Sequence, residues 1–474
     1  MSTKHVVILG GGPSGLYAAR VLSLKGMKVT ILDKGKNPGG LACGHQFNQN
    51  WYDTGVHMFH AHEKEIFEDI KKLMASERIE VPLNAKIKWS GNFYRYPLQF
   101  QDMIKGIPFF TLTKQVIGLF AAQLSNYFSP KEPHNAEEAL IQLYGNPLYE
   151  FFFRDFTHRY WGIHPRELSA TFITTKMPRL SAVDVIKRAL AKVGVRDKTK
   201  AVDSALREEI LSYSITGTET LPRSIVKGIQ EKNGTVIQEA EVIKVITENN
   251  KITQIVYLKN NQEQVISCDE CISTIPINRL IDAITPSAPS EVLNSAKMLK
   301  YKPISVYGLL VKKQKCIDSL YIYYRDRIFH RVGEPKNAGL IVTPAHYTTL
   351  IVETTCEIND AKWNGEDSVK KKMLEDLALE DICLPEEVVE IHQIKSETGY
   401  PIFALGFEPF LETVKKYLKS FDNFQTIGRQ GNFCYPNMHT AMRMGADAAN
   451  KIILKHQSDI TEKVEQKDAE LALA

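Results

Sequence analysis

Three glycines near the start of the chain have the spacing of a phosphate-binding turn. Gly10, Gly12 and Gly15 follow the apolar run 6–9 and precede residues 16–24, whose apolar positions repeat with a helical period. The first glycine permits a tight turn, the second lets the backbone approach a pyrophosphate, and the third lets helix and strand pack closely. The helix start adds free N–H groups and the positive end of a dipole. The pattern predicts a dinucleotide site; a glycine-rich turn without a ligand is the alternative.

A carboxylate and two more glycines extend this pattern. Asp33 ends the apolar run 29–32, where a carboxylate can bond the ribose hydroxyls of an adenosine. Gly39 and Gly40 form a second glycine turn shortly afterwards. We therefore expect residues 1–60 to form a strand–helix–strand unit followed by a loop.

A third glycine segment lies near the other end of the chain. Gly428 and Arg429 follow a short apolar run and precede a helix expected over about 438–454. Gly428 allows close approach to a cofactor, Arg429 can neutralise a pyrophosphate, and the start of a helix favours negative charge. A surface turn with a solvated arginine is the alternative.

The composition narrows the class of protein. A chain of 474 residues is too long for one simple core, and 43% apolar and 24% charged residues are ordinary for a globular protein. The net charge of +4, from 59 Lys and Arg against 55 Asp and Glu, gives no field that would attract nucleic acid. Seven scattered cysteines favour a reducing, cytoplasmic compartment, and the Cys268–Cys271 C-x-x-C lacks a second pair at zinc spacing.

The most hydrophobic stretch covers residues 106–128. Pro108, Lys114 and several polar residues interrupt it, so we expect no integral membrane segment. A buried or groove-lining helix is the expected structure, and contact with a membrane surface is the alternative.

Taken together, these motifs resemble a known enzyme group. The glycine turns, Asp33, residues 273–276 and the Gly428-Arg429 pair match the FAD-binding pattern of amine oxidases, protoporphyrinogen oxidases and UDP-galactopyranose mutases. The resemblance covers both ends and most of the chain's length. It departs mildly at Asp33, where these enzymes usually carry glutamate. It implies an FAD cofactor bound without a covalent link.

Two segments are most similar to the UDP-galactopyranose mutases. Residues 55–60 resemble their histidine-bearing loop beside the flavin, which implies that His57 contacts the flavin; a structural histidine in a tight turn is the alternative. Residues 147–168 resemble the segment whose aromatic side chains hold the nucleotide base by stacking, and a core stripe is the alternative.

The chain departs from the mutases at the arginines that hold the substrate's diphosphate. One of those arginines, just before a tyrosine, is replaced here by Cys434, before Tyr435. A second corresponds to Lys176, and a third is kept as Arg331. A thiol cannot bind a diphosphate as a guanidinium does. The resemblance therefore supports an FAD cofactor more strongly than it supports a diphosphate substrate.

These arguments give the following candidate residues. The catalytic candidates are His57, Arg331 and Lys176, with Arg179 as a further cation for the leaving diphosphate. The FAD-binding candidates are Gly10, Gly12, Pro13, Ser14, Gly15, Asp33, Lys34, Gly39, Gly40, Leu41, His57, Val242, Thr274, Gly428, Arg429 and Met438. The substrate-binding candidates are Phe152, Phe156, Trp161, Arg331, Cys434 and Tyr435. No metal is expected, because His60 and His62 have no further ligands nearby.

The expected fold is α/β, with a Rossmann-type FAD-binding domain and an inserted mixed α+β substrate domain. The first domain is assembled from residues 1–95, 205–280 and 395–456, and the second from 96–204 and 281–394. Alternation of apolar and polar residues over 300–355 predicts an antiparallel sheet that includes a strand at 340–344. Residues 457–474 are expected to form a flexible tail.

The resemblance implies two alternative activities on a small-molecule substrate. In a mutase-like isomerase, reduced flavin attacks the anomeric carbon of a nucleotide-activated sugar, the diphosphate leaves, and the sugar recloses with the other ring size, with no net redox change. In an oxidoreductase resembling protoporphyrinogen oxidase or amine oxidases, the flavin takes a hydride from a small molecule and passes the electrons on. The sequence predicts no particular oligomeric state.

Overall fold

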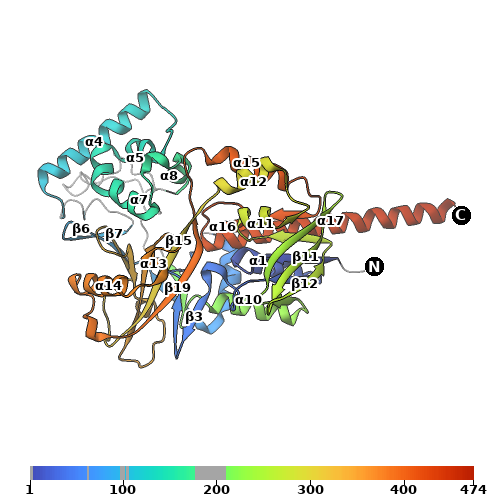
Figure 1. The fold of residues 1–474 in the computed structure, drawn as a ribbon, viewed down its shortest axis with the longest axis horizontal. Coiled ribbons are helices and arrows are strands. Elements are labelled where there is room, and N and C mark those ends of the chain that lie inside the picture. The colour runs from blue at the N-terminus through green and yellow to red at the C-terminus, as the bar shows by residue number, and fades with distance from the viewer. Residues whose placement is uncertain (1–3, 61–62, 97–101, 103–105, 177–209, 474) are drawn as a thin grey trace, which may run out of the picture. The chain divides into compact units, whose positions relative to one another are not determined.

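The structure is a computed structural model that describes residues 4–473, apart from 61–62, 97–101, 103–105 and 177–209. For residues 174–176 and 459–473 it describes the backbone only. The chain divides into two compact units. Unit 1 is made of Met1–Ile79, Ser212–Lys300 and Pro409–Ala474, and unit 2 of Glu80–Leu211 and Tyr301–Glu408. Each unit is therefore assembled from separate parts of the chain (Figure 1).

Unit 1 is built on a parallel five-stranded sheet with the order β20-β13-β1-β2-β9. A four-stranded sheet of order β12-β11-β10-β14 and the hairpin β3-β4 accompany it. In chain order these strands are β1 (His5–Leu9), β2 (Lys28–Leu32), β3 (Gly44–Phe47), β4 (Asn50–Asp53), β9 (Thr235–Ile237), β10 (Glu241–Glu248), β11 (Lys251–Lys259), β12 (Gln262–Ser267), β13 (Glu270–Ser273), β14 (Ile284–Thr285) and β20 (Phe424–Thr426).

The helices of unit 1 pack around this sheet. They are α1 (Pro13–Leu24), α2 (Lys64–Met74), α10 (Thr220–Glu231), α11 (Ile277–Ala283), α12 (Ser290–Met298), α16 (Gly428–Gly431) and α17 (Met438–Leu473), with most of α15 (Phe407–Leu418). α1 contacts both α10 and α17. Because Gly445 has no side chain, α17 lies directly on the backbone of α1; a Cβ there would come within 2.2 Å of the Ser14 carbonyl oxygen.

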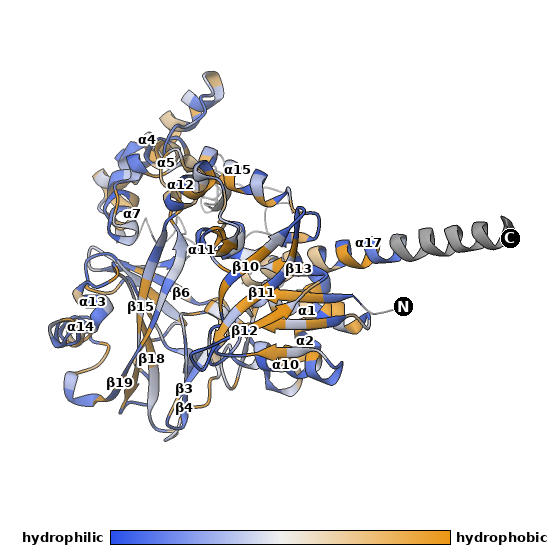
Figure 2. Ribbon diagram, turned by 45° about the vertical axis from the view of Figure 1, so that its right-hand side comes forward, coloured by the Kyte–Doolittle hydropathy of each residue, from blue (hydrophilic) through white to orange (hydrophobic). Residues whose placement is uncertain are grey.

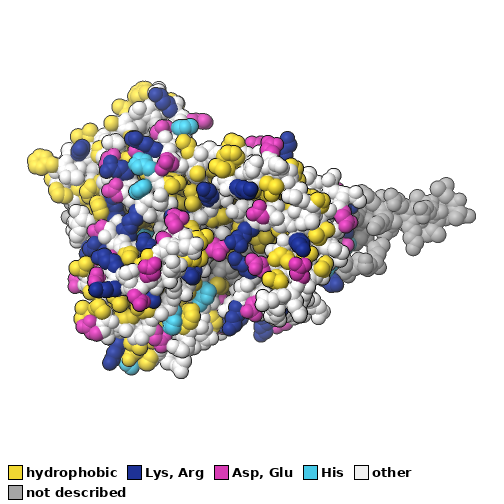
Figure 3. All heavy atoms as spheres, viewed as in Figure 1, with side chains coloured by type: hydrophobic (Ala, Val, Ile, Leu, Met, Phe, Trp, Pro, Cys, Tyr) yellow, Lys and Arg dark blue, Asp and Glu magenta, His cyan; other side chains and the backbone are white. Residues whose placement is uncertain are grey.

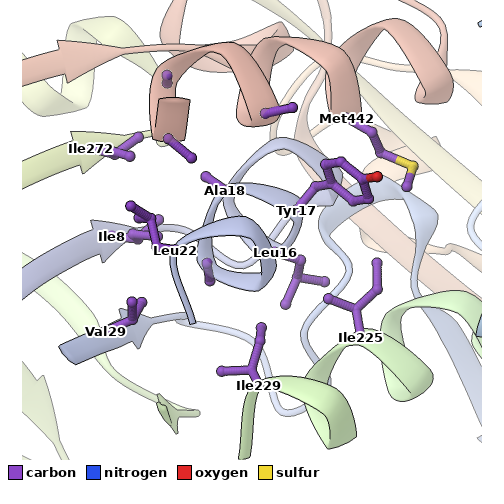
Figure 4. Close-up of a cluster of buried hydrophobic side chains, with 14 of the residues drawn as sticks. Ile8, Leu16, Tyr17, Ala18, Leu22, Val29, Ile225, Ile229, Ile272 and Met442 are labelled. Carbon is purple, nitrogen blue, oxygen red and sulfur yellow. The ribbon is translucent and has the colours of Figure 1, made fainter. Parts of the chain in front are cut away.

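The core of unit 1 lies between the parallel sheet and these helices. Ile8 and Ile272 from neighbouring strands meet Leu16 and Leu22 of α1, and Met442 of α17 closes the cluster (Figure 4). Residues 6–9 are fully buried along β1, the central strand of the parallel sheet. Figure 2 shows the strands beside α1 in the hydrophobic colour.

Unit 2 contains a seven-stranded sheet of order β19-β15-β18-β17-β16-β6-β7. β16 runs parallel to β6, and the other neighbouring pairs are antiparallel. The strands are β6 (Ala85–Trp89), β7 (Asn92–Tyr96), β15 (Tyr301–Val311), β16 (Tyr321–Tyr324), β17 (Arg331–Gly333), β18 (Thr348–Thr355) and β19 (Val388–Pro401). The chain passes between the units after Ile79 in β5 (Arg78–Pro82), after Leu211 in β8 (Ile210–Ser214), after Lys300, and after Glu408 in α15.

The helices of unit 2 fall into a helical group from the first part of the chain and a pair from the second. They are α4 (Phe109–Phe128), α5 (Ala136–Tyr144), α6 (Asn146–Leu148), a π-helical turn at Tyr149–Phe153, α7 (Arg154–Trp161), α8 (Ala170–Lys176), α13 (Ala361–Asn364) and α14 (Asp367–Leu379). The fold class expected from the sequence is confirmed: a Rossmann-type unit is combined with a mixed α+β unit.

The limits of the two units differ from the expected domain limits because of strand pairing. Residues 80–95, expected in the first domain, lie in unit 2, where β6 pairs with β16. Residues 395–408 also lie in unit 2, because β19 continues along β15 to Pro401. Residues 281–300 lie in unit 1, where β14 pairs with β10.

Three local expectations are also corrected. Residues 340–344 form no strand, because β15 and β17 already occupy both edges of β18. Residues 457–473, expected as a flexible tail, are helical as the end of α17, in keeping with a stretch 458–473 that lacks Gly and Pro. The stretch 106–128 is not a buried helix, because α4 buries only Gln115 and Leu119.

Candidate functional site

The first glycine turn joins β1 to α1, and other atoms pack closely against Gly10 and Gly15. The Gly10 N–H donates to the Leu32 carbonyl at 2.8 Å, and the Thr274 hydroxyl lies 3.0 Å from the carbonyl oxygens of Leu9 and Gly10. A Cβ at Gly10 would meet Thr274 at 2.4 Å, and one at Gly15 would meet the Gly10 oxygen at 2.1 Å. These two glycines are therefore required by packing.

Gly12 differs from its neighbours because a Cβ built on it would meet no atom within 4 Å. Gly12 is the N-cap of the 12-residue helix α1, and no side chain caps that end. Pro13, Ser14 and Gly15 follow as the first residues of the helix, whose early N–H groups have no partner within a helix. Open space beside the uncapped start of a helix fits a pyrophosphate.

The second glycine turn lies directly on the first. The Gly39 N–H donates to the Gly11 carbonyl at 2.7 Å, and a Cβ at Gly40 would lie 3.2 Å from the Gly12 Cα. Leu41 follows, half-buried, in the short helical turn Gly40–Ala42. We call residues 10–15, 39–41 and Gly428 the glycine cradle.

Gly428 belongs to this cradle although it is more than 400 residues away in sequence. A Cβ on it would lie 2.6 Å from the Ser14 hydroxyl oxygen, and its φ of +80° suits only glycine. The Arg429 guanidinium lies 4.5 Å from the Tyr435 ring centroid and donates to the Pro436 carbonyl at 3.1 Å. α16 has four residues, so the helix that follows this segment is α17, which begins at Met438.

Asp33 directly follows β2 and is hydrogen-bonded to the glycine turn after β1. Its two carboxylate oxygens accept the N–H groups of Gly11 at 2.6 Å and Gly35 at 2.7 Å. Burial raises the pKa of Asp33, and these two N–H groups oppose the rise. A carboxylate has about four acceptor positions, so acceptors remain for ribose hydroxyls. Lys34 beside it is exposed, and Val242 lies in β10 two residues after Ala240, whose N–H donates to the Asp33 carbonyl at 2.9 Å.

Two buried acids, Glu219 and Asp53, form hydrogen bonds near the hairpin β3–β4. The Glu219 carboxylate accepts the Gly44 N–H at 2.9 Å, and burial raises its pKa from 4.5 to about 7. Asp53 accepts the Tyr213 hydroxyl at 2.5 Å and the Thr218 N–H at 3.0 Å. β4 ends at Asp53, and His57 follows, half-buried, in the turn after it.

Arg331 of unit 2 is held in a buried ion pair. Its Nε and Nη2 donate to the two oxygens of Glu353 at 2.7 and 2.6 Å, and His330 lies 3.7 Å from the same carboxylate. Burial alone would raise the pKa of Glu353, but Arg331 and His330 outweigh it and hold the pKa well below its usual value. The charge of Arg331 is therefore largely neutralised inside the protein.

Aromatic side chains surround this ion pair. The guanidinium lies 5.4 Å from the Tyr321 ring centroid and 5.5 Å from that of Tyr323. Phe156 of α7 packs edge-on against Tyr323 and stacks on Tyr160, which itself contacts His330.

The three aromatic candidates for base stacking occupy different environments. Phe152 is 6% exposed and packs edge-on against Tyr94, and Trp161 is 4% exposed and contacts Phe172 and Tyr400. Both are parts of the core of unit 2. Phe156 is half-buried, so of the three it keeps the most accessible ring.

The remaining candidates are placed as follows. The backbone of Lys176 ends α8, but its side chain lies outside the described residues, as does all of Arg179. The Cys434 N–H donates to the Arg429 carbonyl at 3.0 Å, and its thiol lies 3.5 Å from the Gly428 carbonyl. Cys434 and Tyr435 thus lie beside the glycine cradle in unit 1, whereas Phe156 and Arg331 belong to unit 2.

Sequence reasoning missed three charged residues. Glu353 lies in the apolar strand pattern of 348–355, where an isolated acid signals a buried partner. The other two, Arg159 and Lys362, carry no such signal. In the described part of the chain neither has a carboxylate within ion-pair distance; Arg159 donates to the Phe329 carbonyl at 2.5 Å.

Comparison with known proteins identifies the family. The model of the family described as flavin containing amine oxidoreductases matches residues 13–344, and the chain belongs to this family. It is a flavin-dependent enzyme, and its cofactor is FAD.

The chain is similar to the following relatives and solved structures. It is 27% identical over 188 residues to a Klebsiella pneumoniae protein described as a probable UDP-galactopyranose mutase, and 25% identical over 173 residues to the dTDP-fucopyranose mutase of Escherichia coli. Each match covers 36% of this chain and 45% of the relative, so less than half of each relative is spanned. The fold is similar to that of reduced UDP-galactopyranose mutase, with a TM-score of 0.78, 20% identity, and coverage of 96% of this chain and 94% of the other. Putrescine oxidase bound to putrescine gives a TM-score of 0.61 at 14% identity, covering 96% and 99%.

Metal sites and membrane-spanning helices are both absent from the described residues. They contain no group of His, Cys, Asp and Glu arranged to hold a metal ion. Across the same residues, no helix has the length and apolar character needed to cross a membrane.

Proposed function

We propose that this flavoenzyme is an isomerase that changes the ring size of a nucleotide-activated sugar. The observation that carries the proposal is the presence in unit 2 of two cations, Arg159 and Lys362, that have no carboxylate partner among the described residues. Both are half-buried. Carboxylates act on both from beyond ion-pair distance, Asp326 and Asp376 on Arg159 and Asp360 on Lys362. Cations without a direct ion pair favour an anionic substrate, such as a sugar diphosphate, and disfavour an amine.

The cofactor would be held by the glycine cradle. The backbone at Gly12 and the start of α1 would take the pyrophosphate, and Asp33 would bond the adenosine ribose. Arg429, which lies in the same unit, would add positive charge, and His57 and Met438 would lie on the flavin side. When bound and reduced, FAD would supply a nucleophilic nitrogen for attack on the anomeric carbon.

The electrostatic setting of Arg159 and Lys362 suits a leaving diphosphate. Burial lowers the pKa of Arg159. Burial first, and the nearby Arg159 second, lower the pKa of Lys362. The carboxylate of Asp360, two residues before Lys362, accepts the N–H groups of Glu357 and Trp363 and opposes the lowering of the Lys362 pKa. A diphosphate would relieve the repulsion between the two cations, and it would be stabilised most as its charge develops on leaving.

Arg331 would have a different role in this proposal. Because Glu353 binds it through both oxygens, its guanidinium would support the tyrosines around it rather than bind the diphosphate by itself. The half-buried ring of Phe156 would take the nucleotide base, since stacking requires only an accessible aromatic face.

A second candidate function is a net oxidoreductase of the same family. The observation that favours it is Cys434, because the resembling mutases carry a diphosphate-binding arginine before the tyrosine. In this alternative the substrate carries no diphosphate, and the unpaired cations of unit 2 serve another anion.

Equilibrium binding of UDP to the FAD-loaded protein tests the proposal. Arg159→Met removes a charge-assisted hydrogen bond worth about 1.5–3 kcal/mol, so UDP affinity is expected to fall on the order of 10–100-fold. Arg154→Met is the matched control: it lies on the same helix, is 44% exposed and pairs with Glu150, and it is expected to leave UDP affinity unchanged. Equal UDP affinity in wild type and Arg159→Met, combined with tight binding of putrescine, would support the oxidoreductase instead.

A further inference from the structure

The chain enters α7 through the π-helical turn Tyr149–Phe153. The Arg154 N–H donates to the Tyr149 carbonyl, so this turn contains one residue more than an α-helical turn. One residue corresponds to about 100° of rotation about the helix axis, since an α-helix has about 3.6 residues per turn. The π-helical turn therefore sets the direction in which the side chains of α7 project, including those of Phe156 and Arg159.

The side chain of Arg325, which directly follows β16, is attached to this turn. Its guanidinium donates to the carbonyl of Phe151, in the middle of the turn. The same guanidinium lies 3.4 Å from the ring centroid of Trp89, the last residue of β6. The Phe151 ring packs edge-on against Trp89, with centroids 5.9 Å apart. Arg325 thus joins the turn to β6 and to the segment after β16.

The burial of Arg325 is costly. Its side chain is 3% exposed, and burial lowers its pKa to about 10. Among the described residues its ion-pair contact is with Asp155, 3.9 Å away and 68% exposed, and its Nε and Nη2 have no hydrogen-bond partner. On the face shown in Figure 3, by contrast, Lys and Arg side chains lie at the surface with Asp and Glu among them. An apolar side chain would fill this site at lower cost, so stability does not explain an arginine here.

The loop that carries Arg325 contacts α7 a second time. This loop, residues 325–330, joins β16 to β17, and the Tyr324 N–H closes it by donating to the His330 carbonyl at 2.9 Å. Near the other end of α7, Arg159 donates to the Phe329 carbonyl at 2.5 Å. One loop therefore holds α7 both at its start and near its end.

The loop is itself anchored to α14. The Ile328 N–H donates to the Asp376 carboxylate at 2.7 Å, and Arg327 pairs with Glu380, directly after α14, at 2.5 Å. Both carboxylates are buried. The loop is thus a fixed support against which the π-helical turn and α7 are held.

We propose that Arg325 is a positioning residue for the nucleotide-binding side chains of α7. By holding the π-helical turn, it fixes the rotation of α7 at which the Phe156 ring and the Arg159 guanidinium serve one ligand. The benefit to substrate binding rests on the proposed function, whereas the fixed rotation of α7 does not.

Hydrogen exchange of the FAD-loaded full chain, followed by mass spectrometry, tests the fixed rotation. Arg325→Met keeps an apolar side chain of similar length but removes the donor to Phe151. Exchange within residues 149–161 is expected to become faster by on the order of 10–100-fold, as the loss of a charge-assisted hydrogen bond implies. Arg327→Met is the matched control, because Arg327 is a 24% exposed arginine of the same loop that pairs with Glu380. It is expected to leave this exchange unchanged, and unchanged exchange in Arg325→Met overturns the proposal.

UDP affinity of the same proteins tests whether Arg325 acts through α7. Arg325→Met is expected to weaken UDP binding about 10-fold in the wild type but by a clearly smaller factor in the Arg159→Met background, where part of what it positions is gone. Independent substitutions would give the same factor in both backgrounds to within about 2-fold, and that result overturns the proposal. A wild type that does not bind UDP would contradict the proposed function, and hydrogen exchange alone would then decide the role of Arg325.

Discussion

Gly12 allows cofactor binding to be tested separately from folding. Its φ of −72° is accessible to any residue, and the space beside its Cα is free of protein atoms. Gly12→Val should therefore fold normally, yet the added methyls would occupy the pyrophosphate position. We expect FAD affinity to fall on the order of 100-fold, as the loss of about 3 kcal/mol implies. FAD absorbance after gel filtration measures this, with Gly228→Ala in α10 as the control that keeps its FAD. Full FAD retention by Gly12→Val would refute the assignment.

The free energy of unfolding is expected to depend on the buried ion pair between Arg331 and Glu353. Arg331→Met leaves a buried carboxylate without its partner, which costs about 3–5 kcal/mol of unfolding free energy. The double variant Arg331→Met/Glu353→Leu removes both charges and should recover most of that loss. Urea unfolding of wild type, single and double variants provides the measurement. A single variant as stable as wild type would show that the ion pair contributes nothing to unit 2.

At the residue scale, the sequence predicted local structure where the signal comes from consecutive residues. The glycine spacing predicted a turn between a strand and a helix, and residues 10–12 lie between β1 and α1, because such a turn depends on a few consecutive residues. The partner of Arg331 could not be found in this way, because Glu353 lies 22 residues away and meets it only through the register of β17 on β18.

At the scale of elements, Glu219 links the start of α10 to β3. Its pKa is raised from 4.5 to about 7 in the folded protein, so between these values the folded state binds more protons than the unfolded state. Its contribution to stability is complete below about pH 4.5 and is lost as pH rises through 7. Glu219→Gln cannot ionise, and it keeps an acceptor for the Gly44 N–H.

The prediction is a change in the difference between two melting temperatures. The Tm of wild type minus that of Glu219→Gln should fall as pH rises from 5 to 8, and thermal unfolding followed by circular dichroism measures it. A difference that stays constant over this range would contradict the raised pKa.

Several elements followed from periodicity alone, and others did not. The alternation of apolar and polar residues over 300–355 predicted an antiparallel sheet, and β15, β16, β17 and β18 pair antiparallel there. Helix α4 shows why periodicity has a limit: an apolar face has the same pattern whether a core or another molecule covers it. Residues 340–344 have a strand-like pattern, but strand formation also needs a free sheet edge, which β18 does not offer.

At the scale of the whole molecule, the family and fold class were predictable because glycine motifs at both ends belong to one cradle. The limits of the units were not, because they depend on pairings such as β6 with β16, whose residues are more than 200 positions apart. Assembly of each unit from separate segments also explains why Gly428 can pack on Ser14.

Anaerobic turnover of the reduced, FAD-loaded enzyme tests the central claim most directly. UDP-galactopyranose and, separately, dTDP-fucopyranose would be incubated with the enzyme, and the ring size of the sugar followed by NMR while flavin absorbance records its redox state. We expect conversion to the furanose form over many turnovers, with no oxidant consumed and the flavin reduced throughout. No ring exchange with either sugar, together with reduction of the oxidised enzyme by a substrate without a nucleotide, would contradict it.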